Sequence, residues 1–385
     1  MKQRNSKFGA GPTLTLSVAL AMLVSACGGG SSSGNATAQV SSSSTSSSGT
    51  ASSSSSSSSS SGVTSQNTYA TMADASLGVV GSTNGDITFP ADNAWNTEIS
   101  DTTAFPVDPN SAALIEHIGA GTGLHMDFGT TSELYGIPYV VVDSTQPRVS
   151  LSINSSTGYP SESDVFPMPI PTNAPIEGGS NYAAIGGDGH VIVVSRSPFT
   201  GIVQQLFELW HAQPQASGTW TADASAAFDI TSDNVRPTTA GQCDVTSADA
   251  AGLPIFPGLV RYDEVESGAI HHALRFTVAS SRAGFVPPAN HWASTSTATN
   301  FPPMGMRVRL QASYLIPSTF SKESQVILQA LKTYGMIVAD NGSNWFVSGT
   351  TDDRWANLPL FSELGTVKGS NFEVIQMNGL VTSCP

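Results

Sequence analysis

The sequence predicts a mainly β fold, a single β-sandwich or jelly-roll-like domain with a few packed helices. Short stretches in which polar and apolar residues alternate recur along the chain, as at residues 306–310 (Met-Arg-Val-Arg-Leu), which is typical of half-buried strands. Turn-forming residues separate them, for example Gly-Asp-Gly at 187–189 and Asn-Gly at 341–342. Helical patterns are few, and this combination favours packed sheets.

The expected strands run through residues 67–385, which we expect to form one globular domain because neither a second linker nor a repeat interrupts them. Each is a short run rich in Val, Ile, Leu or Phe. The strands are predicted at residues 139–142, 149–153, 191–195, 203–210, 270–278, 306–314 and 344–348.

Two longer helices are predicted. Residues 109–118 begin with Pro after Asp108 and stop at Gly119, the residues that favour helix ends. Residues 322–336 follow Ser321, a good N-cap, and carry an apolar stripe that would pack on the core. Two further segments, 247–251 and 263–267, each have room for about one helical turn.

The N-terminal residues 1–27 have the layout of an export signal, with basic residues before an apolar stretch at 14–24 that is too short to span a bilayer of about 30 Å. The stretch ends in Val-Ser-Ala-Cys, which resembles the lipobox of bacterial lipoproteins. The resemblance implies lipidation of Cys27, and for a Gram-negative source Gly28 in place of Asp implies the outer membrane. We therefore expect an exported protein, lipid-anchored at the cell surface.

Residues 28–66 form a Ser-rich linker, with 20 Ser among residues 28–62 and no charged side chain there. Such a segment buries too little apolar surface to offset its chain entropy, so we expect disorder. A flexible chain of this length spans roughly 30–35 Å. Poly-Ser tethers of this kind resemble those of secreted bacterial enzymes that degrade polysaccharides.

The chain has 15 Lys and Arg against 29 Asp and Glu, a formal charge of −14, which becomes −17 once the three basic residues of the signal are removed. That charge excludes general nucleic-acid binding and attraction to anionic lipid, which both need a cationic face. Membrane contact is expected through the lipid anchor only. In an exported protein, Cys243 and Cys384 are expected to form a disulfide.

Residues 252–278 hold the densest group of reactive side chains. Asp263 and Glu264 precede a predicted turn, and a strand then carries His272 and Arg275. As a functional set, these residues would supply acid–base catalysis and a clamp for a substrate carboxylate or sulfate. The structural alternative is that Arg275 pairs with a carboxylate across the sheet while His272 is a hydrogen-bonded core histidine.

Two His/Asp pairs with a spacing of two, His125 with Asp127 and Asp188 with His190, form an alternative metal site, since side chains at i and i+2 of a strand share a face. Such pairs are common by chance, so no metal is favoured and no cofactor is assigned. The structural alternative is a turn-capping Asp beside a hydrogen-bonded His.

Residues 339–345 follow the second predicted helix and resemble a tight turn into a strand. As a functional group, Asp340, Asn344 and Trp345 would line a carbohydrate-binding cleft together with His291. The structural alternative is that Asp340 makes the turn and that the aromatic side chain belongs to the core.

Several strings, FPADNAWNTEIS, GIPYVVVD, TSADAAGLPIFPGLVRYDEV, IHHALRFT and LKTYGMIVADNGSNWF, resemble a family of secreted bacterial proteins of unassigned activity. The resemblance covers most of residues 88–375. It implies one continuous domain and transfers no catalytic residue.

Three functions follow from these patterns. The first is a surface-tethered, glycan-active enzyme, a hydrolase or a lyase acting on extracellular polysaccharide, with Asp263 or Glu264 as its acid or base. The second is a non-catalytic glycan-binding or adhesion lipoprotein. The third is a metal-dependent hydrolase built on the two His/Asp pairs. The absence of P-loop, G-x-S-x-G and H-E-x-x-H motifs disfavours other common enzyme classes.

Overall fold

A computed structural model describes residues 67–233, 236 and 245–384, which all fall into one unit by their contacts. The export signal, Cys27, the Ser-rich linker and Cys243 lie outside the described residues, so the predictions made for them stay predictions. The described part holds sixteen strands and five α-helices, which confirms the mainly β prediction. None of its helices combines the length and apolarity that crossing a membrane requires.

One large sheet has five strands in the order β11-β8-β7-β5-β2. Its strands are β2 (Gly78–Val79), β5 (Tyr139–Val142), β7 (Val191–Ser195), β8 (Leu206–Trp210) and β11 (Ala224–Phe228). β5 and β7 are parallel and the other pairs are antiparallel. The predicted strands at 139–142 and 191–195 are therefore present with the same bounds.

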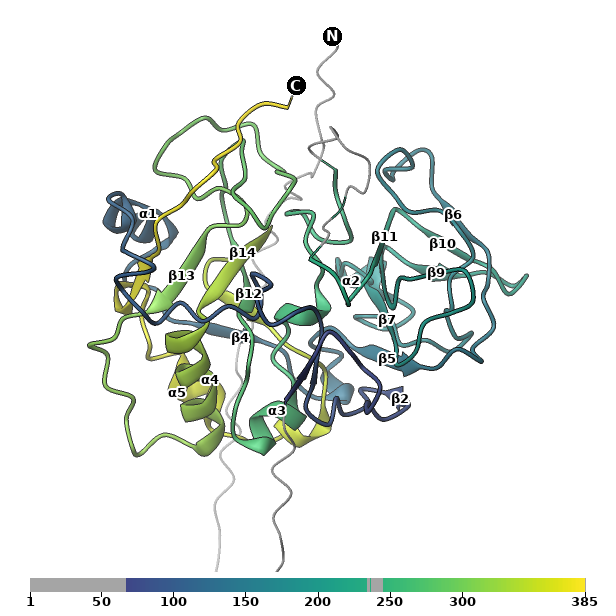
Figure 1. Cartoon of the computed structure of the whole chain (residues 1–385), viewed down its shortest axis with the longest axis horizontal. Coiled ribbons are helices and arrows are strands. Elements are labelled where there is room, and N and C mark those ends of the chain that lie inside the picture. Colours follow the sequence, from purple (N-terminus) through teal and green to yellow (C-terminus); the bar gives the residue numbers. More distant parts are fainter. Residues whose placement is uncertain (1–66, 234–235, 237–244, 385) are drawn as a thin grey trace, which may run out of the picture. The chain divides into compact units, whose positions relative to one another are not determined.

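The second large sheet has six strands in the order β16-β13-β14-β12-β15-β4 (Figure 1). Its strands are β4 (His125–Asp127), β12 (Leu274–Val278), β13 (Arg307–Leu310), β14 (Met336–Asn341), β15 (Phe346–Ser348) and β16 (Phe372–Val374). The pairs β12–β14 and β15–β4 are parallel, so this sheet is mixed as well.

Two small sheets complete the strands. One pairs β1 (Thr68–Tyr69) with β3 (Asp86–Ile87), and the other has the order β6-β10-β9. Those last strands are β6 (Leu151–Ile153), β9 (Gln213–Pro214) and β10 (Trp220–Ala222).

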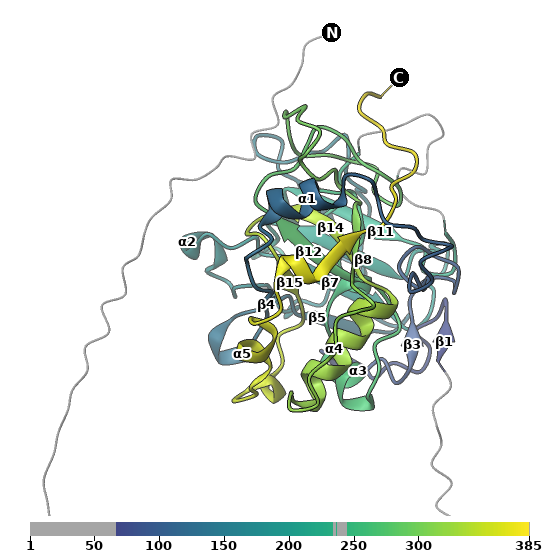
Figure 2. The same cartoon turned by 90° about the vertical axis from the view of Figure 1, so that its left-hand side faces the viewer.

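The helices begin and end where local chemistry allows. α1 (Ser111–Ile118) stops at Gly119, whose φ of 110° favours glycine. α4 (Lys322–Thr333) starts at Ser321, whose side chain accepts a hydrogen bond from the Ser324 amide, as predicted. The others are α2 (Tyr182–Ile185), α3 (Tyr262–Ser267) and α5 (Leu360–Leu364). Figure 2 shows α3, α4 and α5 gathered at one end of the sheets, with α1 at the other.

The five-stranded sheet is buried on both faces. Ile192 and Val194 join a core that also contains Phe276 and Val338 of the six-stranded sheet. Val191 and Val193 face a second core, which the five-stranded sheet shares with the β6-β10-β9 sheet. This burial explains why the β7 sequence is continuously apolar instead of alternating.

A β-bulge lies between the two central strands of the six-stranded sheet. The register between β12 and β14 shifts after Phe276, so that Thr277 pairs with Asp340 and Ala339 is the extra residue. The carbonyl oxygen of Ala339 accepts a hydrogen bond from the Ala251 amide, 2.9 Å away. Bulges of this kind change the direction in which the following side chain points.

Candidate functional site

Six charged side chains make up what we call the charged cluster: Glu177, Asp188, His190, Asp249, Arg275 and Asp340. Arg275 lies on β12 and Asp340 on β14, and the other four lie in connecting segments. Residues 248–251 connect His190 with these two strands, although the sequence suggested a helical turn there. The carbonyl oxygen of Ala248 accepts from His190, and the Ala251 amide bonds to β14. Asp249, between them, lies fully buried beside Arg275.

The Arg275 side chain on β12 makes its hydrogen bonds to Asp249 and Ser348. Its Nε and Nη2 atoms lie 3.2 and 2.9 Å from the two carboxylate oxygens of Asp249, and its Nη1 donates to the Ser348 hydroxyl at 2.5 Å. The side chain is 4% exposed. Asp340 lies at the edge of this pair, with Oδ2 at 4.0 Å from Nη2 and 23% of its side chain exposed. One guanidinium thus faces two carboxylates, of which one is accessible.

Burial raises the pKa of both carboxyl groups, and that of Asp340 rises well above its ordinary value. The charges of Asp249 and Asp188 add to this rise in the pKa of Asp340, against the opposing effect of Arg275. Asp249, not Asp340, makes the bidentate contact with the Arg275 guanidinium. We conclude that Asp340 holds a proton far into the pH range in which an ordinary Asp is ionised.

His190 is held as a cation at the amino end of β7. Its Nδ1 lies 2.5 Å from Glu177 Oε2 and its Nε2 lies 3.1 Å from the Ala248 carbonyl oxygen. A carbonyl oxygen only accepts, so Nε2 carries a hydrogen and Nδ1 shares one with the carboxylate. Burial opposes the charge, but Glu177 outweighs it and raises the pKa of His190 to about 9.

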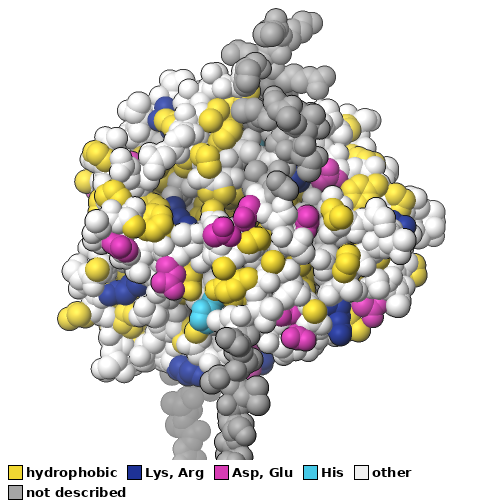
Figure 3. All heavy atoms as spheres, in the orientation of Figure 1, with side chains coloured by type: hydrophobic (Ala, Val, Ile, Leu, Met, Phe, Trp, Pro, Cys, Tyr) yellow, Lys and Arg dark blue, Asp and Glu magenta, His cyan; other side chains and the backbone are white. Residues whose placement is uncertain are grey.

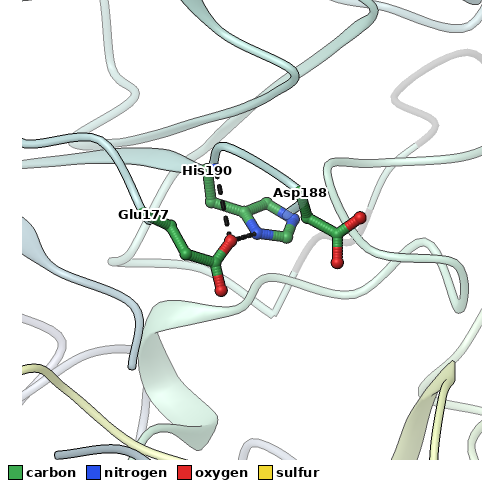
Figure 4. A group of neighbouring side chains, drawn as sticks. All are labelled: Glu177, Asp188 and His190. Atoms are coloured by element: carbon green, nitrogen blue, oxygen red, sulfur yellow. Dashed lines mark hydrogen bonds and ion pairs between the residues drawn. The ribbon is translucent and has the colours of Figure 1, made fainter. Parts of the chain in front are cut away.

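Asp188 reaches solvent from a glycine turn between α2 and β7. Gly189 has a φ of 60°, and a Cβ at this position would collide with the ring of Tyr182, so only glycine fits. The indole Nε1 of Trp210 donates to Asp188 Oδ1 at 3.3 Å. Figure 4 shows Asp188 and Glu177 on opposite sides of the His190 ring.

A metal site is the other chemistry these residues suggest. Among the described residues, one group of His, Asp or Glu brings three ligand atoms within 4.8 Å of one another, namely Glu177, Asp188 and His190. Both ring nitrogens of His190 donate in this arrangement, so neither offers a lone pair to a metal. The geometry fits an imidazolium–carboxylate ion pair better than a metal centre.

The predicted metal ligands separate in the structure. Asp188 and His190 belong to the charged cluster, but His125 and Asp127 lie on β4 at the edge of the six-stranded sheet. His125 is exposed, stacks on Phe346 with ring centroids 3.9 Å apart, and has Nε2 at 3.2 Å from the Tyr135 hydroxyl. The two pairs do not build one site.

The predicted catalytic residues are likewise divided. Asp263 accepts hydrogen bonds from Ser82 and Thr83, whereas Arg275 belongs to the charged cluster. Glu264 and His272 are buried together, with Glu264 Oε2 at 3.2 Å from His272 Nε2. Asp263 and Glu264 do line a pocket of about 440 Å³, but His272 and Arg275 do not.

Glu264 is unsuited to donate a proton. Burial opposes its ionisation, but Arg261 and His272 outweigh burial and lower the pKa of Glu264 to about 2. His272 donates from Nδ1 to the Ala273 carbonyl oxygen, and its Nε2 lies 2.9 Å from Arg261 Nη2 and 3.2 Å from Glu264 Oε2. The contacts of His272 and Arg275 therefore match the structural alternatives given above. His272 is a hydrogen-bonded core histidine, and Arg275 belongs to a buried ion pair.

The predicted substrate-binding residues have three different surroundings. Trp345 is fully buried, stacks between Phe276 and Phe372, and donates to the Gly119 carbonyl oxygen. Asn344 accepts from the Ala279 amide, and His291 is buried with Nδ1 at 2.5 Å from the Ala250 carbonyl oxygen. Asp340 alone among the four is part of the charged cluster.

Sequence reasoning missed Glu177 and Asp249. Asp249 lay inside a string that resembled a family, but it was assigned to a helical turn. Glu177 follows Pro and Ile in an irregular segment and gave no signal at all. Comparison with protein-family models, curated proteins and solved structures finds no match to this chain.

Proposed function

We propose that the protein is a surface-tethered enzyme that hydrolyses an extracellular polysaccharide at the charged cluster. The observation that carries the proposal is that two accessible carboxyl groups, Asp340 and Asp188, lie close enough for the charge of Asp188 to raise the pKa of Asp340. Asp340 shares Arg275 with Asp249 and retains its proton, and its pKa responds to the charge of the exposed Asp188. Glycoside hydrolysis needs one carboxyl group as acid and a second as base or nucleophile.

In this proposal, Asp340 gives its proton to the glycosidic oxygen as the bond to the anomeric carbon breaks. Asp188, held by Trp210, takes a proton from the water that adds to that carbon. Arg275 and His190 touch no substrate and act by fixing the charges around the two carboxyl groups. The lipid anchor at Cys27 and the Ser-rich linker would hold this centre away from the membrane.

The test uses the full chain and a panel of neutral, amino, uronic and sulfated polysaccharides, with reducing ends and absorbance near the unsaturated-uronate band as readouts. We expect new reducing ends without absorbance. Asp340→Asn and Asp188→Asn should each lower the rate about 10²–10⁴-fold, the usual contribution of a general acid or base.

Asp143→Asn is the matched control. Asp143 is partly exposed and follows β5 at the carboxyl end of the parallel β5–β7 pair, whereas Asp188 and His190 precede β7. Its replacement should leave the rate unchanged. If absorbance near the unsaturated-uronate band accompanies every new reducing end, the enzyme is instead a lyase. Retention on a polysaccharide gel without cleavage would mean a glycan-binding lipoprotein.

A further inference from the structure

We propose that the substrate of the charged cluster is a glycan without acidic groups, either neutral or carrying an amine. This inference rests on the proposed function and adds the chemical class of its substrate. It follows from which charges of the cluster a ligand can reach.

The two cations of the cluster are enclosed. Arg275 and His190 each have 4% of their side chains exposed. Every contact described for their nitrogens is to a protein acceptor, namely Asp249 and Ser348 for Arg275 and Glu177 and Ala248 for His190. Burial therefore keeps both cations from direct contact with a uronate or a sulfate.

The accessible groups of the cluster are carboxyl groups, of which Asp340 holds a proton while Asp188 and Glu177 supply the negative charge. Asp188 is exposed, and Glu177 and Asp340 keep 21% and 23% of their side chains exposed. His211, whose backbone amide donates to the Asp188 carbonyl oxygen, is 35% exposed and has its Nδ1 atom 3.1 Å from an Asp223 carboxylate oxygen. An anionic sugar would lose hydration here and gain like-charge repulsion in return.

On the face of the molecule drawn in Figure 3, the described residues also offer an acidic chain no basic surface to follow. There, Lys and Arg side chains of the described residues are single and scattered among acidic and apolar ones, without a continuous basic stripe. The formal charge of −14 acts in the same direction at long range.

The experiment measures the binding of the full chain to polymers that differ only in charge. Polygalacturonate is compared with its methyl ester, and chitosan with its carboxymethyl derivative, by affinity electrophoresis or calorimetry at low salt. Asp340→Asn is used so that binding is measured without turnover. We expect the uncharged or cationic member of a pair to bind at least tenfold more tightly than its acidic partner.

Two variants test whether the preference for the less acidic polymer comes from the charged cluster. Asp188→Lys places an accessible cation there and should reduce or reverse the preference, whereas Asp143→Lys should leave it unchanged. Equal or tighter binding of the acidic members, or no binding of either member of any pair, overturns the inference. An unaltered preference in Asp188→Lys also overturns it.

The failure of this inference and that of the proposed function are distinguishable. Cleavage of an acidic polymer that is lost in Asp340→Asn would overturn the inference and leave the proposed hydrolase standing. Charge-selective binding that depends on Asp188, in a protein that cleaves nothing, would support the inference for a binding site and overturn the hydrolase.

Discussion

Replacement of Arg275 by Met tests whether this residue is a buried counter-ion or a substrate clamp. The change removes the partner of Asp249, which is fully buried, while keeping an apolar side chain of similar length in place. Removing one member of a buried ion pair leaves an uncompensated charge and costs about 3–5 kcal/mol. We expect the free energy of unfolding to fall by that amount in urea titrations.

A second replacement identifies the cause. In Arg275→Met/Asp249→Asn the unpaired charge is gone, and the amide can still accept from the Ala250 amide as the carboxylate does. The double variant should therefore recover about 2 kcal/mol relative to Arg275→Met. Arg354→Met is the surface control, since Arg354 is 44% exposed in its pair with Asp352, and it should change stability by less than about 1 kcal/mol.

The opposite outcome would refute the assignment. If Arg275→Met unfolds like the wild type but no longer retains an acidic polysaccharide, Arg275 is accessible to substrate and the charged cluster is misinterpreted.

Three further predictions follow from the same contacts. The His190–Glu177 pair should contribute about 3 kcal/mol that is fully present below about pH 6.5 and lost as the pH rises through about 9, so His190→Gln should differ from wild type at pH 6 and much less at pH 10 in urea unfolding. Gly189→Ala should destabilise the fold and abolish hydrolysis through its collision with Tyr182, whereas Gly201→Ala, with similar φ and open space, should show only the backbone strain of about 1 kcal/mol. Peptide mapping without reduction should find Cys243 joined to Cys384, a loop of about 140 residues that the entropy model values at about 5 kcal/mol, and free thiols at both positions would contradict it.

The fold class and several elements were predictable because their signals are local. The Ser321 cap and the apolar stripe after it specify α4, and the run Val191–Ser195 specifies a buried strand. β14 was missed because its first residue was assigned to the preceding helix and its last residues to a turn. Gly335, with a φ of 67°, ends the helical path two residues after α4 and lets the chain enter β14 directly.

The site was predictable only as separate residues. Asp188, His190, Arg275 and Asp340 were all singled out, but in three different roles. Residues 248–251 join them, through contacts with His190 just before β7, with β12 and with β14, which are distant parts of the sequence. Periodicity and spacing report neighbours along one element, so they carry no information about such a connection.

The most direct test of the account is the proton-donor role of Asp340. Once a cleaved polysaccharide is known, the same sugar linked to a nitrophenol leaving group needs little or no proton donation. The account predicts that Asp340→Asn lowers cleavage of the polysaccharide by at least 10²-fold but leaves cleavage of the nitrophenyl glycoside within about tenfold of wild type. An equal loss on both substrates, or no loss on the polysaccharide, would contradict it.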